Sequence, residues 1–94
     1  MKRTTKEASE YRIITNDGYM FAEHFDDVSK AEQRAMYLTR NNIEKAFIIF
    51  IQTYTEHTKY DDIKTPLLTK RIETYSVVRE VKQGMIKIIV DRAN

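Results

Sequence analysis

The stretch Ala46-Phe47-Ile48-Ile49-Phe50-Ile51 is the longest unbroken apolar run in the chain and decides the fold. Six residues are far fewer than the roughly twenty that a helix needs to cross a bilayer. Isoleucine and phenylalanine favour a strand over a helix. Alternate residues of a strand point to opposite faces, so both faces of this strand would be apolar. The run therefore predicts a central strand that is covered on both sides.

Two β-prone segments precede this run and predict a hairpin. Residues 10–15 and 19–25 are separated by Asn16-Asp17-Gly18. An Asp-Gly pair between two such segments is a strong hairpin signal, because the turn needs a positive φ that glycine adopts at no steric cost. We therefore expect the first two strands to pair through a tight turn.

A single helix is expected over residues 29–41. Ser29 and Glu32 match a capping box, in which the serine hydroxyl and the glutamate each accept a hydrogen bond from an early backbone N–H. Asn41-Asn42 is a reasonable end, because asparagine tolerates the left-handed cap. The apolar residues recur at steps of three and four and form one stripe, which consists of Val28, Ala31, Ala35 and Leu38. This stripe is expected to pack on one face of the sheet.

Two more strands are expected after the apolar run, over residues 69–81 and 85–90, with a tight turn at Lys82-Gln83-Gly84. Pro66 lies in a polar segment that predicts a loop over residues 59–68. The order of elements is then ββαβββ. This order predicts an α+β fold, an antiparallel sheet of about five strands with one helix packed on one face.

The 94 residues are expected to form a single domain, 1–94, with a flexible basic arm over residues 1–9 and a tail over 91–94. The chain has no cysteine, which excludes disulfides and thiolate metal sites and fits a cytoplasmic protein. No apolar segment follows the basic N-terminus, so we expect no secretory signal.

The net charge of +2 is unevenly spread along the chain. Residues 1–12 and 63–94 are basic, whereas residues 13–62 are acidic. The uneven charge either steers partners toward the protein or reflects ordinary scatter of surface residues.

Few residues are candidates for chemistry. Neither His24 nor His57 lies in a recognised metal-binding spacing, and the adjacent acids suit turns and helix starts. Only two glycines are present, both in predicted turns, so no glycine-rich phosphate loop can form. No serine or threonine lies in a nucleophile elbow. We therefore expect no enzymatic activity, no metal and no cofactor.

The remaining signal is the combination of tyrosines and basic residues on the predicted strands. Such residues on a sheet can bind a protein partner, or stack on and neutralise single-stranded RNA or DNA. Tyrosines are also simply good strand formers. The candidate partner or nucleic-acid surface consists of Tyr54, Lys70, Arg71, Tyr75, Arg79 and Lys87.

In size, composition and lack of catalytic motifs the chain resembles the small accessory proteins of phages and mobile elements, although no motif carries this resemblance. The resemblance implies a non-enzymatic protein that binds and modulates a host macromolecular complex through a protein–protein interface. A nucleic-acid-binding protein is the alternative.

A homodimer is also expected, because one helix can cover only one face of the apolar strand. The sheet face opposite the helix, or the long strands ending near Tyr54 and Thr69, would form the interface.

Overall fold

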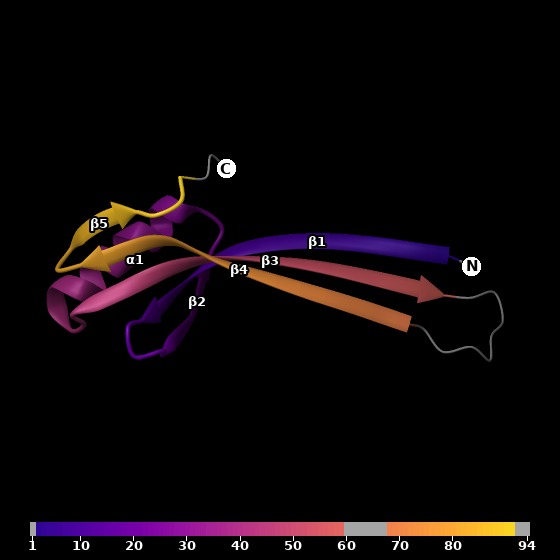
Figure 1. Ribbon diagram of the computed structural model, residues 1–94, viewed down its shortest axis with the longest axis horizontal. Helices are drawn as coiled ribbons and strands as arrows, with labels where there is room; N and C mark the ends of the chain where they lie inside the picture. The colour runs from indigo at the N-terminus through magenta and orange to yellow at the C-terminus, as the bar shows by residue number, and fades with distance from the viewer. Residues whose placement is uncertain (1, 60–67, 92–94) are drawn as a thin grey trace.

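The computed structural model describes residues 2–59 and 68–91, which form a five-stranded antiparallel sheet with one helix (Figure 1). Along the chain the elements are β1 (Lys2–Thr15), β2 (Met20–Phe25), α1 (Val28–Asn41), β3 (Lys45–Lys59), β4 (Leu68–Lys82) and β5 (Met85–Ile88). In space the strands lie in the order β2-β1-β3-β4-β5. The predicted α+β class and the order ββαβββ are confirmed.

The apolar run lies in β3, the central strand of the sheet, with β1 on one side and β4 on the other. Its residues Ala46, Ile48 and Phe50 are buried on the face that packs against α1. Ile49 and Ile51 point to the opposite face and are each only 6% exposed. The prediction of a central strand buried on both faces is confirmed.

The face of β3 that points away from α1 is covered by its neighbours in the sheet. Ile49 lies between Arg12 of β1 and Val77 of β4. In the next row, Ile51 lies between Glu10 of β1 and Tyr75 of β4. The guanidinium of Arg12 folds toward β2, where it donates a hydrogen bond of 2.7 Å to the carbonyl oxygen of Phe21. These isoleucines are therefore buried without a second subunit, and the homodimer remains a prediction.

Helix α1 begins at a different cap from the one predicted. Asp27 is the N-cap, and its side chain accepts a hydrogen bond of 2.9 Å from the backbone N–H of Ser29. The capping box of Ser29 and Glu32 is wrong, because the Glu32 carboxylate binds Arg79 instead. The predicted end is confirmed, since Asn42 is the C-cap, but its φ of −129° is not the expected left-handed conformation.

Both predicted tight turns are present. Gly18, with φ +94°, closes the β1–β2 hairpin and donates a backbone hydrogen bond of 3.0 Å to Thr15. Gln83 and Gly84 link β4 to β5 with φ of 50° and 77°. Positive φ at both loop residues is the geometry of a type I′ hairpin, which suits the twist of the flanking strands.

The molecule has two regions, which we call the head and the ribbon (Figure 1). The head comprises residues 10–51 and 75–91 and includes α1 and the buried core. The ribbon is the three-stranded extension of β1, β3 and β4 beyond α1, with residues 2–9, 52–59 and 68–74. This extension makes the molecule 57 Å long and 26 Å by 16 Å across.

The predicted flexible arm over residues 1–9 needs correction, because residues 2–9 are part of β1. They pair with β3 in one unbroken register that runs from Lys2 opposite Lys59 to Thr15 opposite Ala46. The pairing strand, and not an apolar pattern of its own, makes this segment extended. Most of the predicted loop over residues 59–68, and residues 92–94 of the predicted tail, lie outside the described residues.

Candidate binding surface

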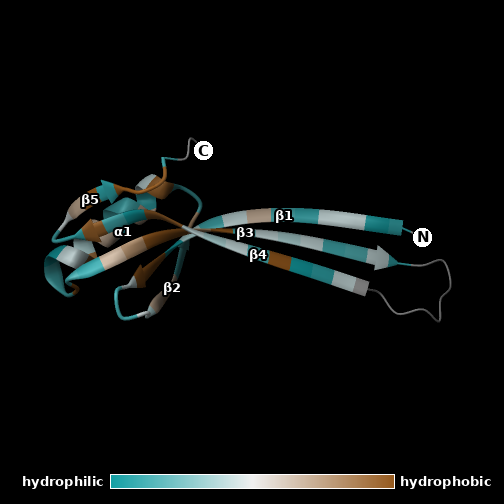
Figure 2. Ribbon diagram, in the orientation of Figure 1, coloured by the Kyte–Doolittle hydropathy of each residue, from teal (hydrophilic) through white to brown (hydrophobic). Residues whose placement is uncertain are grey.

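The ribbon is a polar sheet built from residues with high strand propensity. Its three segments contain seven threonines, whose branched side chains suit a strand even where nothing covers them. Figure 2 shows the contrast: the strands are largely brown within the head and mostly teal or white along the ribbon. The ribbon therefore has two solvent-facing surfaces, which we call the helix-side face and the far face.

The far face of the ribbon is basic. Lys2 lies directly opposite Lys59, and Lys6 lies in one row with Thr55 and Arg71. Glu73 is the only acidic residue of the ribbon that points to this side. In all, the ribbon carries six Lys or Arg residues against three Glu, whereas the described part of the head carries eight against nine. Positive charge is therefore concentrated on the far face.

The helix-side face of the ribbon is close to neutral. Glu56 lies at its centre, 3.6 Å from the guanidinium Nε of Arg3 and directly opposite Lys70. The same carboxylate accepts a hydrogen bond of 2.9 Å from the hydroxyl of Tyr54, which raises the pKa of that phenol above its ordinary value. Tyr54 therefore stays protonated and acts as a hydrogen-bond donor.

A shallow hollow of ≈ 390 Å³ lies on the ribbon near the head. Residues 7–9 and 52–54 line it together with Ile72 and Thr74. Glu7 is the one ionisable carboxylate among these residues, and no histidine or lysine accompanies it.

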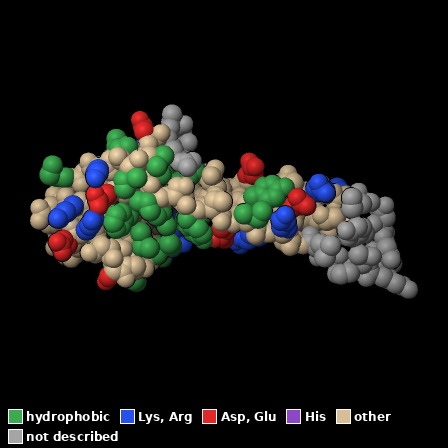
Figure 3. Space-filling model, in the orientation of Figure 1, with side chains coloured by type: hydrophobic (Ala, Val, Ile, Leu, Met, Phe, Trp, Pro, Cys, Tyr) green, Lys and Arg blue, Asp and Glu red, His purple; other side chains and the backbone are tan. Residues whose placement is uncertain are grey.

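Residues 71–75 of β4 expose apolar and charged side chains close together. Ile72 is 43% exposed and Tyr75 is 57% exposed. Arg71 lies 2.7 Å from the carboxylate of Glu73, which also accepts a hydrogen bond from the hydroxyl of Tyr75. The Tyr75 hydroxyl is the main cause that lowers the pKa of Glu73, and the Arg71 charge adds to it. In the space-filling view, a smaller apolar group lies among the charged side chains of the ribbon, apart from the larger one on the head (Figure 3).

The six residues predicted to form one surface lie on different parts of the molecule. Tyr54 and Lys70 are on the helix-side face of the ribbon, whereas Arg71 and Tyr75 point to the far side of the sheet. Lys87 is exposed on β5, opposite Glu80 at the other end of the head. Of the six, Arg71 alone belongs to the basic far face of the ribbon.

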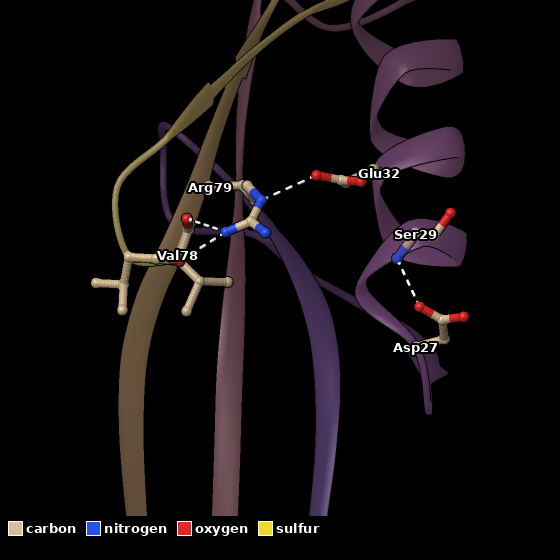
Figure 4. A network of polar contacts seen from close by, with 6 residues as sticks. Asp27, Ser29, Glu32, Val78 and Arg79 are labelled. Carbon is tan, nitrogen blue, oxygen red and sulfur yellow. Dashed lines mark hydrogen bonds and ion pairs between the residues drawn. The ribbon is translucent and has the colours of Figure 1, made fainter. Parts of the chain in front are cut away.

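Arg79 is an interior residue of the head, 5% exposed (Figure 4). Its guanidinium donates hydrogen bonds of 2.9 Å to Glu32 of α1, 2.9 Å to the carbonyl oxygen of Val78 and 2.7 Å to that of Val90. Arg79 is therefore not part of an exposed surface, and its prediction as a surface residue is corrected.

A β-bulge in β4 explains why Arg79 points into the head and not to the far face. Strict alternation from Arg71 would place Arg79 on the far face. The register shifts between Ile48 and Ile49, so that one additional residue of β4 lies in the bulge and Arg79 is opposite Ile48, on the helix side.

The two histidines lie apart from one another. His24 is exposed on β2, and His57 is on the far face, where its Nδ1 lies 3.1 Å from the hydroxyl oxygen of Thr69. Among the described residues no group of three or more His, Asp or Glu side chains is arranged to hold a metal ion. None of the helices in the described part of the chain has the length and apolar character needed to span a membrane.

The residues that sequence reasoning missed are Lys2, Lys6 and Lys59. The alternation Lys2, Thr4, Lys6 would place both lysines on one face of a strand, but this pattern is informative only if the segment is first known to be a strand.

No protein-family model, curated protein or solved structure matches this chain.

Proposed function

We propose that the protein is a non-enzymatic binding module that modulates a macromolecular partner, and that the far face of the ribbon docks on an acidic protein surface. The observation that carries this proposal is the uncovered ribbon, whose far face presents Lys2, Lys6, Lys59 and Arg71 with a single opposing carboxylate.

Charge and shape both support this use of the ribbon. A surface of one predominant sign steers a partner of the opposite sign and restricts which partners can dock. Threonine hydroxyl groups between the basic residues supply donors and acceptors at regular positions along the strands. The head contributes the stability that a polar three-stranded sheet lacks when it stands alone.

The experiment is affinity purification of partners from the source cells at moderate salt, after nuclease treatment, with wild type and two variants. Lys6→Glu plus Lys59→Glu reverses two charges of the far face. The control is Lys30→Glu, which reverses an exposed charge on α1. A protein that is recovered with wild type and the control, but lost with the far-face variant, supports the proposal.

Single-stranded nucleic acid is the second candidate, because the row of Lys6, Thr55 and Arg71 gives the far face a basic track across three strands. Nucleic acid that is recovered without nuclease treatment, and lost with the far-face variant, favours this candidate when no protein is recovered. Its binding would weaken steeply as salt rises, through counterion release. Equal recovery of every component by wild type and the far-face variant would contradict both candidates.

A further inference from the structure

The outer edge of β4 has the sequence Thr69-Lys70-Arg71-Ile72-Glu73-Thr74-Tyr75, which we call the β4 edge. Strand β5 pairs with β4 only from Arg79 to Lys82, and β3 occupies the other side of β4. None of the described strands pairs with the outer side of residues 69–75. An extended strand whose outer edge is open is a template for a further strand.

We propose that two copies of this chain pair through their β4 edges, antiparallel and centred on Ile72, to form one continuous sheet across a two-fold axis. The proposal does not depend on the partner of the far face. Its occupant is a second copy because the edge is complementary to itself.

Symmetry restricts the registers that are possible. An antiparallel pair of identical edges is related by an axis perpendicular to the sheet, so the axis passes through one residue and its own copy. Placed at Ile72, the axis puts Arg71 of each copy opposite Glu73 of the other, which gives two pairs of opposite charge. Cross-strand pairs of opposite charge stabilise a sheet, and like charges directly opposite destabilise it.

Neighbouring registers lack this match. An axis at Arg71 would put Arg71 opposite its own copy, and an axis at Glu73 would put the two Glu73 carboxylates together. An axis at Thr74 would put Glu73 opposite Tyr75 and leave Arg71 without a carboxylate opposite. The register centred on Ile72 is the one in which Arg71 and Glu73 both face opposite charges, while Lys70 faces Thr74.

The remaining contacts of this register also fit. The two Ile72 side chains, 43% exposed in the single chain, would meet at the axis and cover one another. Tyr75, 57% exposed, would lie opposite Thr69, which is a favourable aromatic and β-branched pair. The apolar groups that the ribbon exposes on β4 are thereby covered, and the far faces of two ribbons become one surface.

The first test is sedimentation equilibrium from micromolar to submillimolar concentration. Wild type is expected to form a dimer as the concentration rises. Arg71→Glu and Glu73→Arg each put like charges opposite one another and are expected to weaken association by at least about tenfold. The control is Lys30→Glu on α1, which reverses an exposed charge away from the β4 edge and should leave association unchanged.

Mixing the two weakened variants separates this interface from the ion pair within one chain. Both cross-strand pairs become complementary when Arg71→Glu faces Glu73→Arg, so the mixture is expected to form a heterodimer that neither variant forms alone. A role confined to the Arg71–Glu73 pair within one chain would not produce it.

A crosslink tests the register. The natural chain has no cysteine, so Ile72→Cys introduces a single thiol. Under mild oxidation it is expected to form a disulfide between two copies, because the two positions meet at the axis. Thr74→Cys should not crosslink, since its copy lies four residues away along the sheet. A monomer at every concentration, a dimer that is indifferent to Arg71→Glu and Glu73→Arg, or crosslinking at position 74 in place of 72 would overturn the proposal.

Discussion

The head and the ribbon share three strands, yet different interactions maintain the two regions. In the head, β3 is buried on both faces and α1 covers Ile48, which is fully buried. In the ribbon the same strand carries mostly polar side chains, and the described residues supply no covering layer. A strand therefore needs an apolar core only where it must supply stability. Beyond the core, cross-strand pairing and strand propensity keep the same strands extended.

Truncating one isoleucine in each region tests this contrast most directly. Ile48→Ala removes a fully buried side chain and should lower the free energy of unfolding by about 2–5 kcal/mol. Ile72→Ala, on the ribbon, should lower it by less than about 1 kcal/mol. Urea denaturation of both variants at low protein concentration measures the difference. Similar losses for the two variants would mean that the ribbon carries as much of the stability as the head.

The buried ion pair of the head gives the next largest expected effect. Glu32→Gln leaves the guanidinium of Arg79, whose side chain is 6% exposed, without its carboxylate. We expect a loss of about 1–3 kcal/mol in the free energy of unfolding, because a buried charged donor loses its best acceptor. Glu44→Gln changes an exposed carboxylate and should stay within about 0.5 kcal/mol of wild type. Equal thermal stability of the two variants would contradict the structural role of Arg79.

The two glycine turns of the head differ in how closely side chains pack against them. A Cβ at Gly18 meets no atom within 4 Å, whereas a Cβ at Gly84 collides with the side chain of Arg40. Both alanine variants incur the strain of a positive φ, and Gly84→Ala should be the less stable by about 1 kcal/mol. Thermal unfolding of the pair measures this difference. The opposite order would mean that Arg40 moves away without loss.

The smallest expected effect is a dependence of the stability on pH. The Lys45 ammonium, 2.8 Å from Glu80, holds the pKa of that carboxyl below its ordinary value of 4.5, and Lys87 and Lys82 add to the shift. Because the folded pKa lies below the unfolded one, this ion pair contributes its full stability above pH 4.5 and loses it as the pH falls through the folded pKa. Lys45→Met should raise the Glu80 pKa toward 4.5 in a carboxyl NMR titration. Lys87→Met should raise it less, and an unchanged titration in the Lys45 variant would contradict the pairing.

Much of the fold could be predicted because its signals are local. The apolar run, the glycine turns and the spacing of the helix each depend on a few consecutive residues. The strand over residues 2–9 could not be predicted in this way, since its polar sequence has no apolar alternation. It is extended because β3 offers a partner that is distant in sequence, as in the pairing of Thr5 with Glu56, 51 residues further along the chain.

The candidate surface was harder to predict than the fold, because a surface depends on which residues share a face. Arg71 and Arg79 are eight residues apart, and uninterrupted alternation predicts one face for both. A single extra residue in β4 turns Arg79 into the head, and no local feature of the sequence marks it. Residue type alone therefore groups Arg71 with Arg79, whereas the strand register places them on opposite faces of the sheet.

The segment after β5 has a consequence for any strand that approaches β4. The carbonyl oxygen of Val78 already accepts backbone hydrogen bonds of 3.0 Å from Ile89 and 3.2 Å from Val90. An incoming strand that advanced toward the head would meet this occupied position and could advance no further. The segment after β5 thus limits how far an added strand can extend along β4, and in which direction its register can shift.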